Sequence, residues 1–238
     1  MSEQRYSNPY PTQTPSALGV TPDARLSTAF LTQAFLWMFV GLLVSAGVAF
    51  VVQGNEQLVR FATGNLLILL IAQLAIVVVI SAGITRLSAT LALGLFFVYA
   101  ASLGLTIGLI VGRYPQASVV GAFVSAAGMF GGAALYGAVT KRSLTGFGGI
   151  LFMGVIGVIV ASVINIFFAS SVISWIIALV GVVIFTALTA YDVQRIGRGD
   201  LAARTGSMEK AAVIGALQLY LDFVNIFLFM LRLFGGRN

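Results

Sequence analysis

The chain has 238 residues, of which 59% are hydrophobic and only 8% are charged, and its net charge is +6. Soluble domains carry about 25% charged residues, so this composition excludes a soluble enzyme, a disordered regulator and a nucleic-acid-binding module, and it indicates a polytopic helical membrane protein. The chain has no Cys and no His, which excludes disulfides, thiol nucleophiles, Cys/His metal sites and histidine pH switches and leaves proton chemistry to carboxylates, Tyr, Lys or Arg.

The first 28 residues differ in composition from the rest. They hold four of the five prolines, separated by Ser, Thr, Gln and Asn. Such a segment cannot bury enough apolar surface to fold by itself. The sequence therefore predicts a flexible polar tail over 1–28, followed by a transmembrane domain over 29–238.

Seven apolar stretches follow the tail, and each is long enough for a membrane-spanning helix of about 20 residues. The connections between them are short, except for 54–64 and 195–210. We therefore expect an all-α bundle of seven transmembrane helices. The predicted spans are 29–53, 65–84, 87–111, 117–139, 147–168, 172–194 and 211–234.

Basic residues in the connections predict the orientation. If the N-terminus is cytoplasmic, nine Lys and Arg residues fall inside and four outside. Because cytoplasmic loops are enriched in these residues, the N-terminus is expected inside and the C-terminus outside. The nine are Arg5, Arg25, Arg86, Lys141, Arg142, Arg195, Arg198, Arg204 and Lys210, and the four are Arg60, Arg113, Arg232 and Arg237.

Glycines recur in the third and fourth spans. Gly104, Gly108 and Gly112 are spaced four residues apart in the third span, and Gly128, Gly131, Gly132 and Gly137 follow in the fourth. Small residues let helix backbones approach closely inside a membrane. We expect these glycines to pack helices together within one monomer, in preference to forming an oligomer interface.

One carboxylate lies in the middle of the last span. Asp222 is far along the helix from the nearest charges, Lys210 and Arg232. A charge at mid-bilayer costs about 2.5–3.5 kcal/mol on insertion scales, so it must face the bundle interior. Gln218 and Asn225 share its helix face by the i, i+4, i+7 spacing. The stripe predicts either a functional site or a neutral Asp in an interhelical hydrogen bond.

A second carboxylate, Asp192, lies near the cytoplasmic end of the sixth span. Thr189 and Arg195 lie three residues away on either side, on the same helix face. An ordinary helix-end pair of Asp192 with Arg195 is one interpretation. The other involves Asp222, because a short connection makes the sixth and seventh spans antiparallel neighbours.

Two carboxylates in contact cannot both stay ionised, so the pair would share a proton and form a pH sensor without histidine. It would also be a hard-oxygen cation site. Two aspartates offer too few oxygens for tight Ca²⁺ binding, even with Thr189, Asn165, Asn225 and water, so we expect weak binding suited to a permeation path. Arg86, at the cytoplasmic end of the second span, is either a latch on one carboxylate or a snorkelling topology marker.

Five segments, in order and in the appropriate spans, resemble the Bax inhibitor family, also called the transmembrane Bax inhibitor motif family. The resemblance covers about residues 25–236 and is of the bacterial type. The segments are ALYG (134–137), TKRSL (140–144), VIN (163–165), TAYDVQRI (189–196) and ALQLYLDFVNIF (216–227).

The resemblance implies a seven-helix fold with the last helix near the bundle centre. It implies that Asp192 and Asp222 are the gate of a pH-sensitive Ca²⁺ leak, with an arginine of the second span, here Arg86, latching one aspartate. It also implies an alternative, because bacterial members include a modulator of the FtsH-type membrane protease. An inner membrane location and no cofactor are expected.

An enzyme is the third class of function. The residues 197–200 spell GRGD, which fits the GxGD pattern of intramembrane aspartyl proteases. However, Asp200 lies in an arginine-rich loop, whereas a catalytic dyad needs two facing helices, and Asp222 has no such pattern. We therefore expect no enzymatic activity.

Overall fold

The computed structural model describes residues 24–235, and it describes side chains from residue 29 on. Over 24–235 the backbone forms helices and short connections, with no strand. The long helices are α1 (Ala24–Gln53), α3 (Leu66–Gly83), α4 (Ala89–Val111), α5 (Gln116–Val139), α6 (Gly148–Phe168), α7 (Ser171–Gly197) and α9 (Met208–Gly235). Three short elements connect them: α2 (Glu56–Gly64), the 3-10 turn Thr145–Phe147 and α8 (Asp200–Thr205).

The predicted spans are confirmed. Within the described residues, seven helices are long and apolar enough to cross a membrane, and each predicted boundary lies within three residues of the observed one. Apolar segments of this length become helices in lipid because only the helix satisfies every backbone N–H and C=O group within the segment. Most of the predicted tail lies outside the described residues, and α1 begins at Ala24, ahead of the predicted boundary.

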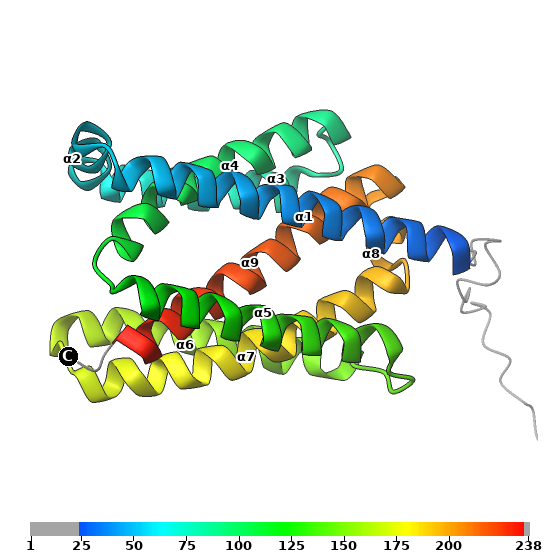
Figure 1. Ribbon diagram of the computed structural model, residues 1–238. Helices are drawn as coiled ribbons and strands as arrows, with labels where there is room; N and C mark the ends of the chain where they lie inside the picture. The colour runs from blue at the N-terminus through cyan, green and yellow to red at the C-terminus, as the bar shows by residue number, and fades with distance from the viewer. Residues whose placement is uncertain (1–23, 236–238) are drawn as a thin grey trace, which may run out of the picture.

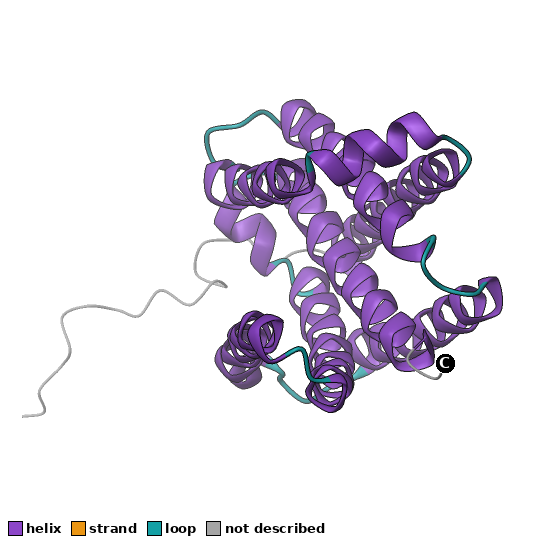
Figure 2. Ribbon diagram, turned by 90° about the vertical axis from the view of Figure 1, so that its left-hand side faces the viewer, coloured by secondary structure: helices purple, strands orange, loops and turns teal. Residues whose placement is uncertain are grey.

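The long helices form two layers with α9 between them (Figure 1). One layer holds α1, α3 and α4, and the other holds α5, α6 and α7. Helix α9 packs on α1 and α4 from the first layer and on α5 and α7 from the second. Figure 2, turned by 90° from the view of Figure 1, shows the helices of the described chain and the loops that join them. In α9, 67% of the spanning window is buried, against 33% at most in the other spans of the described chain. The last helix therefore occupies the bundle centre, as the resemblance implied.

The expected glycine packing holds for the third span. A Cβ at Gly104 would lie 2.7 Å from the Ser45 carbonyl oxygen, and one at Gly108 would lie 2.9 Å from the Val52 Cβ. These glycines therefore seat α4 directly on α1. In α5 it holds for Gly137, where a Cβ would collide with the backbone of Ala190 in α7, and it is wrong for Gly128, Gly131 and Gly132, which have no neighbour within 4 Å of a Cβ position.

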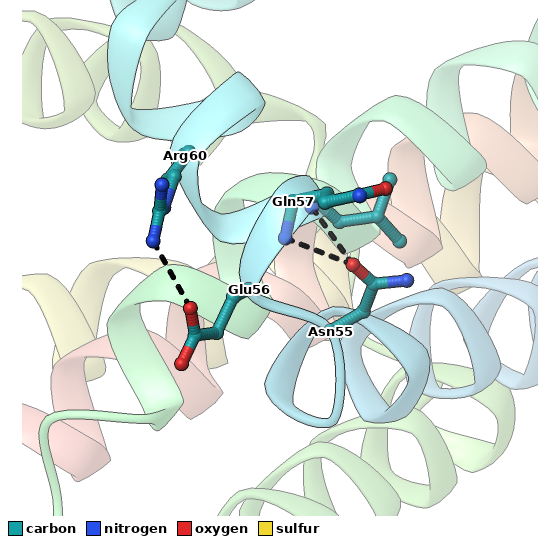
Figure 3. Close-up of polar contacts among 5 residues, drawn as sticks. Asn55, Glu56, Gln57 and Arg60 are labelled. Carbon is teal, nitrogen blue, oxygen red and sulfur yellow. Dashed lines mark hydrogen bonds and ion pairs between the residues drawn. The ribbon is translucent and has the colours of Figure 1, made fainter.

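The connection 54–64 contains a short helix that the sequence analysis did not predict. The Asn55 side chain caps α2 by accepting hydrogen bonds from the backbone N–H groups of Gln57 (2.9 Å) and Leu58 (3.2 Å), as Figure 3 shows. A salt bridge of 3.1 Å joins Arg60 to Glu56 on its exposed side. The cap satisfies N–H groups at the helix start that have no partner within the helix, so α2 forms although it is too short to span a membrane.

Candidate functional site in the α7–α9 interface

Helix α9 carries a buried polar group toward each layer. On the α1–α4 side, the hydroxyls of Tyr220 and Ser45 lie 2.6 Å apart, and Ser45 also donates to the Ala100 carbonyl oxygen at 2.7 Å. The rings of Phe96 and Tyr99 meet the Tyr220 ring edge-on, with centroids 5.5 and 5.9 Å away. The Ser45 and Tyr220 hydroxyls both have partners, so the group ties α1, α4 and α9 together.

The opposite side of α9 brings the predicted aspartates together with α7. Asp222 is 4% exposed, Asp192 is 7% exposed, and Thr189 between them is fully buried. The carboxyls of Asp192 and Asp222 lie close enough to act on each other electrostatically. The antiparallel neighbourhood expected for the last two spans is thus present, because α8 and the short loops around it return the chain directly onto α7.

The hydrogen bonds of this group are incomplete. The Thr189 hydroxyl donates to the Phe185 carbonyl oxygen at 2.9 Å and also contacts the Asp222 carboxyl. The second Asp222 oxygen, Oδ2, is buried and has no hydrogen-bond partner among the described residues, and the same is true of the Gln218 side-chain oxygen. Buried acceptors without partners are rare and costly. Two of them on one face of α9 mark a site that is ready to take a proton, a water or a cation.

Positive charge near the pair comes from α7 itself. Arg195 is half-buried and is the cation that acts on Asp192. It makes no close ion pair with Asp192, since the single salt bridge in the described part of the chain is the one in α2. The helix-end pair considered for Asp192 and Arg195 is therefore loose, and it leaves the carboxylate available to Asp222.

Three of the predicted site residues are arranged differently from the expectation: Asn165 and Arg86 lie away from the aspartate pair, and Asn225 hydrogen-bonds within its own helix. Asn165 hydrogen-bonds to the Ser170 backbone and to the Ser174 hydroxyl (2.7 Å), and it closes the α6–α7 turn. Ser174 is about 27 Å along α7 from Asp192 at 1.5 Å per residue. Arg86 is exposed in the turn between α3 and α4 and has no ion pair among the described residues. Asn225 is half-buried and donates to the Leu221 carbonyl oxygen of α9.

Gln194, two residues after Asp192, has a role that the sequence did not indicate. It is buried, and its side-chain amide donates to the Arg142 carbonyl oxygen at 2.8 Å. Its side-chain oxygen accepts from the Leu144 backbone N–H at 2.7 Å. The loop after α5 is thereby fastened to α7. A bidentate contact of this kind leaves no periodic pattern in the sequence, so no sequence signal points to it.

The chemistry available to the site is that of two carboxyls, a hydroxyl and an amide. Within residues 24–235 no group of three or more Asp, Glu, His or Cys side chains could hold a metal ion. Ca²⁺ prefers six to eight oxygen ligands, and the pair with Thr189 and Gln218 supplies too few oxygens for tight binding.

The model of the family described as inhibitor of apoptosis-promoting Bax1 matches residues 27–238 of this chain. The inner membrane protein YbhL of Escherichia coli K12 is 43% identical over 225 residues, which cover 92% of this chain and 96% of that protein. Uncharacterised proteins of Deinococcus radiodurans (41% identical over 210 residues, 88% and 91% of the two chains) and Borreliella burgdorferi (39% over 218 residues, 90% and 94%) are also similar. These matches and the seven spanning helices of the described region make it a multi-pass protein of the inner-membrane type.

Proposed function

The chain belongs to the Bax inhibitor family, and we propose that it is a pH-sensitive cation leak gated by the Asp192–Asp222 pair, with Ca²⁺ as the favoured cation. The observation that carries the proposal is the Asp222 carboxyl, which is buried at the centre of the bundle with one oxygen lacking any hydrogen-bond partner. A purely structural aspartate would have its acceptors filled.

The pair provides the pH response. When one proton is shared between the carboxyls, a contact through that proton holds α7 and α9 together. A second proton neutralises the pair and weakens that contact, so the path opens more often. A neutral pair also attracts Ca²⁺ poorly. Flux therefore depends on pH over the range in which the pair titrates, and it does not rise without limit in acid.

Aromatic side chains next to the pair provide the barrier of the closed path. The ring of Phe223, the residue after Asp222, packs edge-on against Phe130 and Phe123, with centroids 5.5 and 5.7 Å apart. Phe227, one turn further along α9, also meets Phe123. An apolar constriction excludes water and ions until the helices separate. Movement of α9 away from α5 and α7 is then the step that lets cations reach Asp222.

Cation flux into proteoliposomes tests the proposal. Asp222→Asn keeps the shape of the side chain and removes its charge at the buried centre of the bundle. Flux should therefore fall to the background of empty vesicles. Asp200→Asn, at the start of α8 outside the spans, is the matched control and should conduct as the wild type does. Both variants must first elute as monodisperse protein in detergent.

Wild-type flux and pH response in well-folded Asp222→Asn would contradict the leak. The alternative drawn from the resemblance, an interaction protein that modulates an FtsH-type membrane protease, would then be preferred. Deletion of residues 1–23 separates the two, because a tail-mediated regulator loses its partner and a channel keeps its flux.

A further inference from the structure

A groove runs along α7 on the side away from the aspartate pair. Helices α5 and α6 both pack on α7, and neither packs extensively on the other. The space between them has a volume of about 630 Å³, within the ~300–1,000 Å³ range of small-molecule sites. Ala133 and Tyr136 of α5 form one wall, Phe147 and Leu151 the other, and Ala187 of α7 lies in the floor.

Two glycines close the groove at its basic end. A Cβ at Gly137 would collide with the backbone of Ala190, and one at Gly148 would lie 2.6 Å from the Tyr191 hydroxyl oxygen. Helices α5 and α6 are therefore seated directly on α7 here. The rim residues Tyr136 and Phe147 are about half exposed, so the groove opens sideways, toward the region that lipid chains occupy around a membrane-spanning bundle.

The closed end carries positive charge without a counter-charge. Arg142 and Ser143 line it, and the Arg198 guanidinium donates to the Ser143 hydroxyl at 3.1 Å. No acidic residue lines the groove, and Arg142 has no ion pair among the described residues. Gln194 hydrogen-bonds to the backbone of this loop at Arg142 and Leu144, so the backbone that carries Arg142 and Ser143 is fixed before any ligand arrives.

We propose that this groove binds an anionic phospholipid of the surrounding bilayer, with the phosphate on Arg142 and Ser143 and one acyl chain along the α7 floor. Basic pockets between transmembrane helices recognise lipid headgroups in this way. The groove floor, from Val183 to Tyr191, is about 12 Å long at 1.5 Å per residue, which is long enough for the upper part of an acyl chain. The proposal uses neither Asp192 nor Asp222, so it holds whether or not the protein conducts cations.

Native mass spectrometry of the full chain, released from micelles with equal amounts of phosphatidylglycerol and phosphatidylcholine, tests the charged end. The wild type should retain phosphatidylglycerol in preference to phosphatidylcholine. Arg142→Gln should lower that retention about fivefold, the effect of ~1 kcal/mol per basic residue near an anionic surface. Lys141→Gln removes the same charge from the neighbouring position, which does not line the groove, and should leave retention unchanged.

A second pair of variants tests the apolar part. Ala187→Leu fills the floor and should reduce phosphatidylglycerol retention, whereas Ala138→Leu, exposed on α5 outside the groove, should not. If Ala187→Leu does not fold, Ala133→Leu in the wall replaces it. Equal losses in Arg142→Gln and Lys141→Gln would show binding to a basic surface alone, and full retention in the filled groove would place the lipid elsewhere. Either result overturns the proposal.

Discussion

Tyr220 and Asp222 lie two positions apart on α9 and face opposite layers of the bundle. The Tyr220 hydroxyl is paired with Ser45, and Ser45 is paired with Ala100. Asp222 is also buried, yet one of its oxygens and the side-chain oxygen of Gln218 have no partner in the described part of the chain. The first arrangement is complete and therefore structural. The second is incomplete, and an incomplete polar group at the bundle centre is stable only if its open positions are used.

The largest effect on stability is expected where α4 packs on α1, next to the Ser45–Tyr220 group. Gly104→Ala places a methyl group 2.7 Å from the Ser45 carbonyl oxygen, and backbone cannot move aside cheaply. The unfolding free energy should fall by about 1–3 kcal/mol, the usual cost of overpacking. Gly132→Ala, which meets open space on α5, is the matched control and should not destabilise. Thermal unfolding in detergent measures both, and an unaffected Gly104→Ala would contradict the close packing of α4 on α1.

On the incomplete side, Asp192→Asn should change pH dependence more than flux. The variant keeps the Asp222 charge and removes the carboxyl that shares its proton. The ratio of flux at acid pH to flux at mildly alkaline pH should move toward unity by about tenfold, which corresponds to ~1.4 kcal/mol of coupling between protonation states. Flux across pH in proteoliposomes checks this. A pH profile identical to that of the wild type would remove Asp192 from the gate.

Tyr220→Phe tests whether the Ser45–Tyr220 group is structural only. It removes one hydroxyl from the complete side, while Ser45 keeps its bond to Ala100. Stability should fall by about 1 kcal/mol, the net value of a typical hydrogen bond, and cation flux and its pH response should stay as in the wild type. Tyr136→Phe, at the exposed rim of the lipid groove, is a control that should leave stability unchanged. Loss of flux in folded Tyr220→Phe would mean that the two sides of α9 do not differ in role.

The smallest effect is expected at Arg86. The residue is exposed in a turn and has no ion pair in the described chain, so Arg86→Ala should change stability by no more than about 0.5 kcal/mol and leave the pH profile of flux unchanged. If Arg86 were the latch that the resemblance implies, Arg86→Ala would raise the basal leak and shift the pH profile of flux. The same flux assay distinguishes the two.

The sequence predicted the spans well because, in a membrane, apolar length alone decides where a helix can cross. It missed α2, whose polar residues and nine-residue length hide a helix held by the Asn55 cap. The central position of α9 came from the resemblance, because hydropathy does not say which span the others surround.

The aspartate pair was predictable because the free-energy cost of a charge in the bilayer and the helix periodicity both place Asp222 in the bundle interior. The structure places Asn165 apart from the two aspartates with which the sequence analysis grouped it. It lies three residues from the end of α6, while Asp192 lies near the opposite end of α7, so membrane depth alone separates them. The Gln194 contact and the groove between α5 and α6 depend on how helices sit on α7, and no pattern within a single span records that.

The most direct test is cation flux across pH for the wild type, Asp222→Asn and Tyr220→Phe, reconstituted side by side in equal amounts after each is shown to be monodisperse. Our account predicts no flux above empty vesicles for Asp222→Asn at any pH, and wild-type flux with wild-type pH response for Tyr220→Phe. Equal flux and equal pH response in the wild type and Asp222→Asn would contradict the claim that the incomplete side of α9 is the working site.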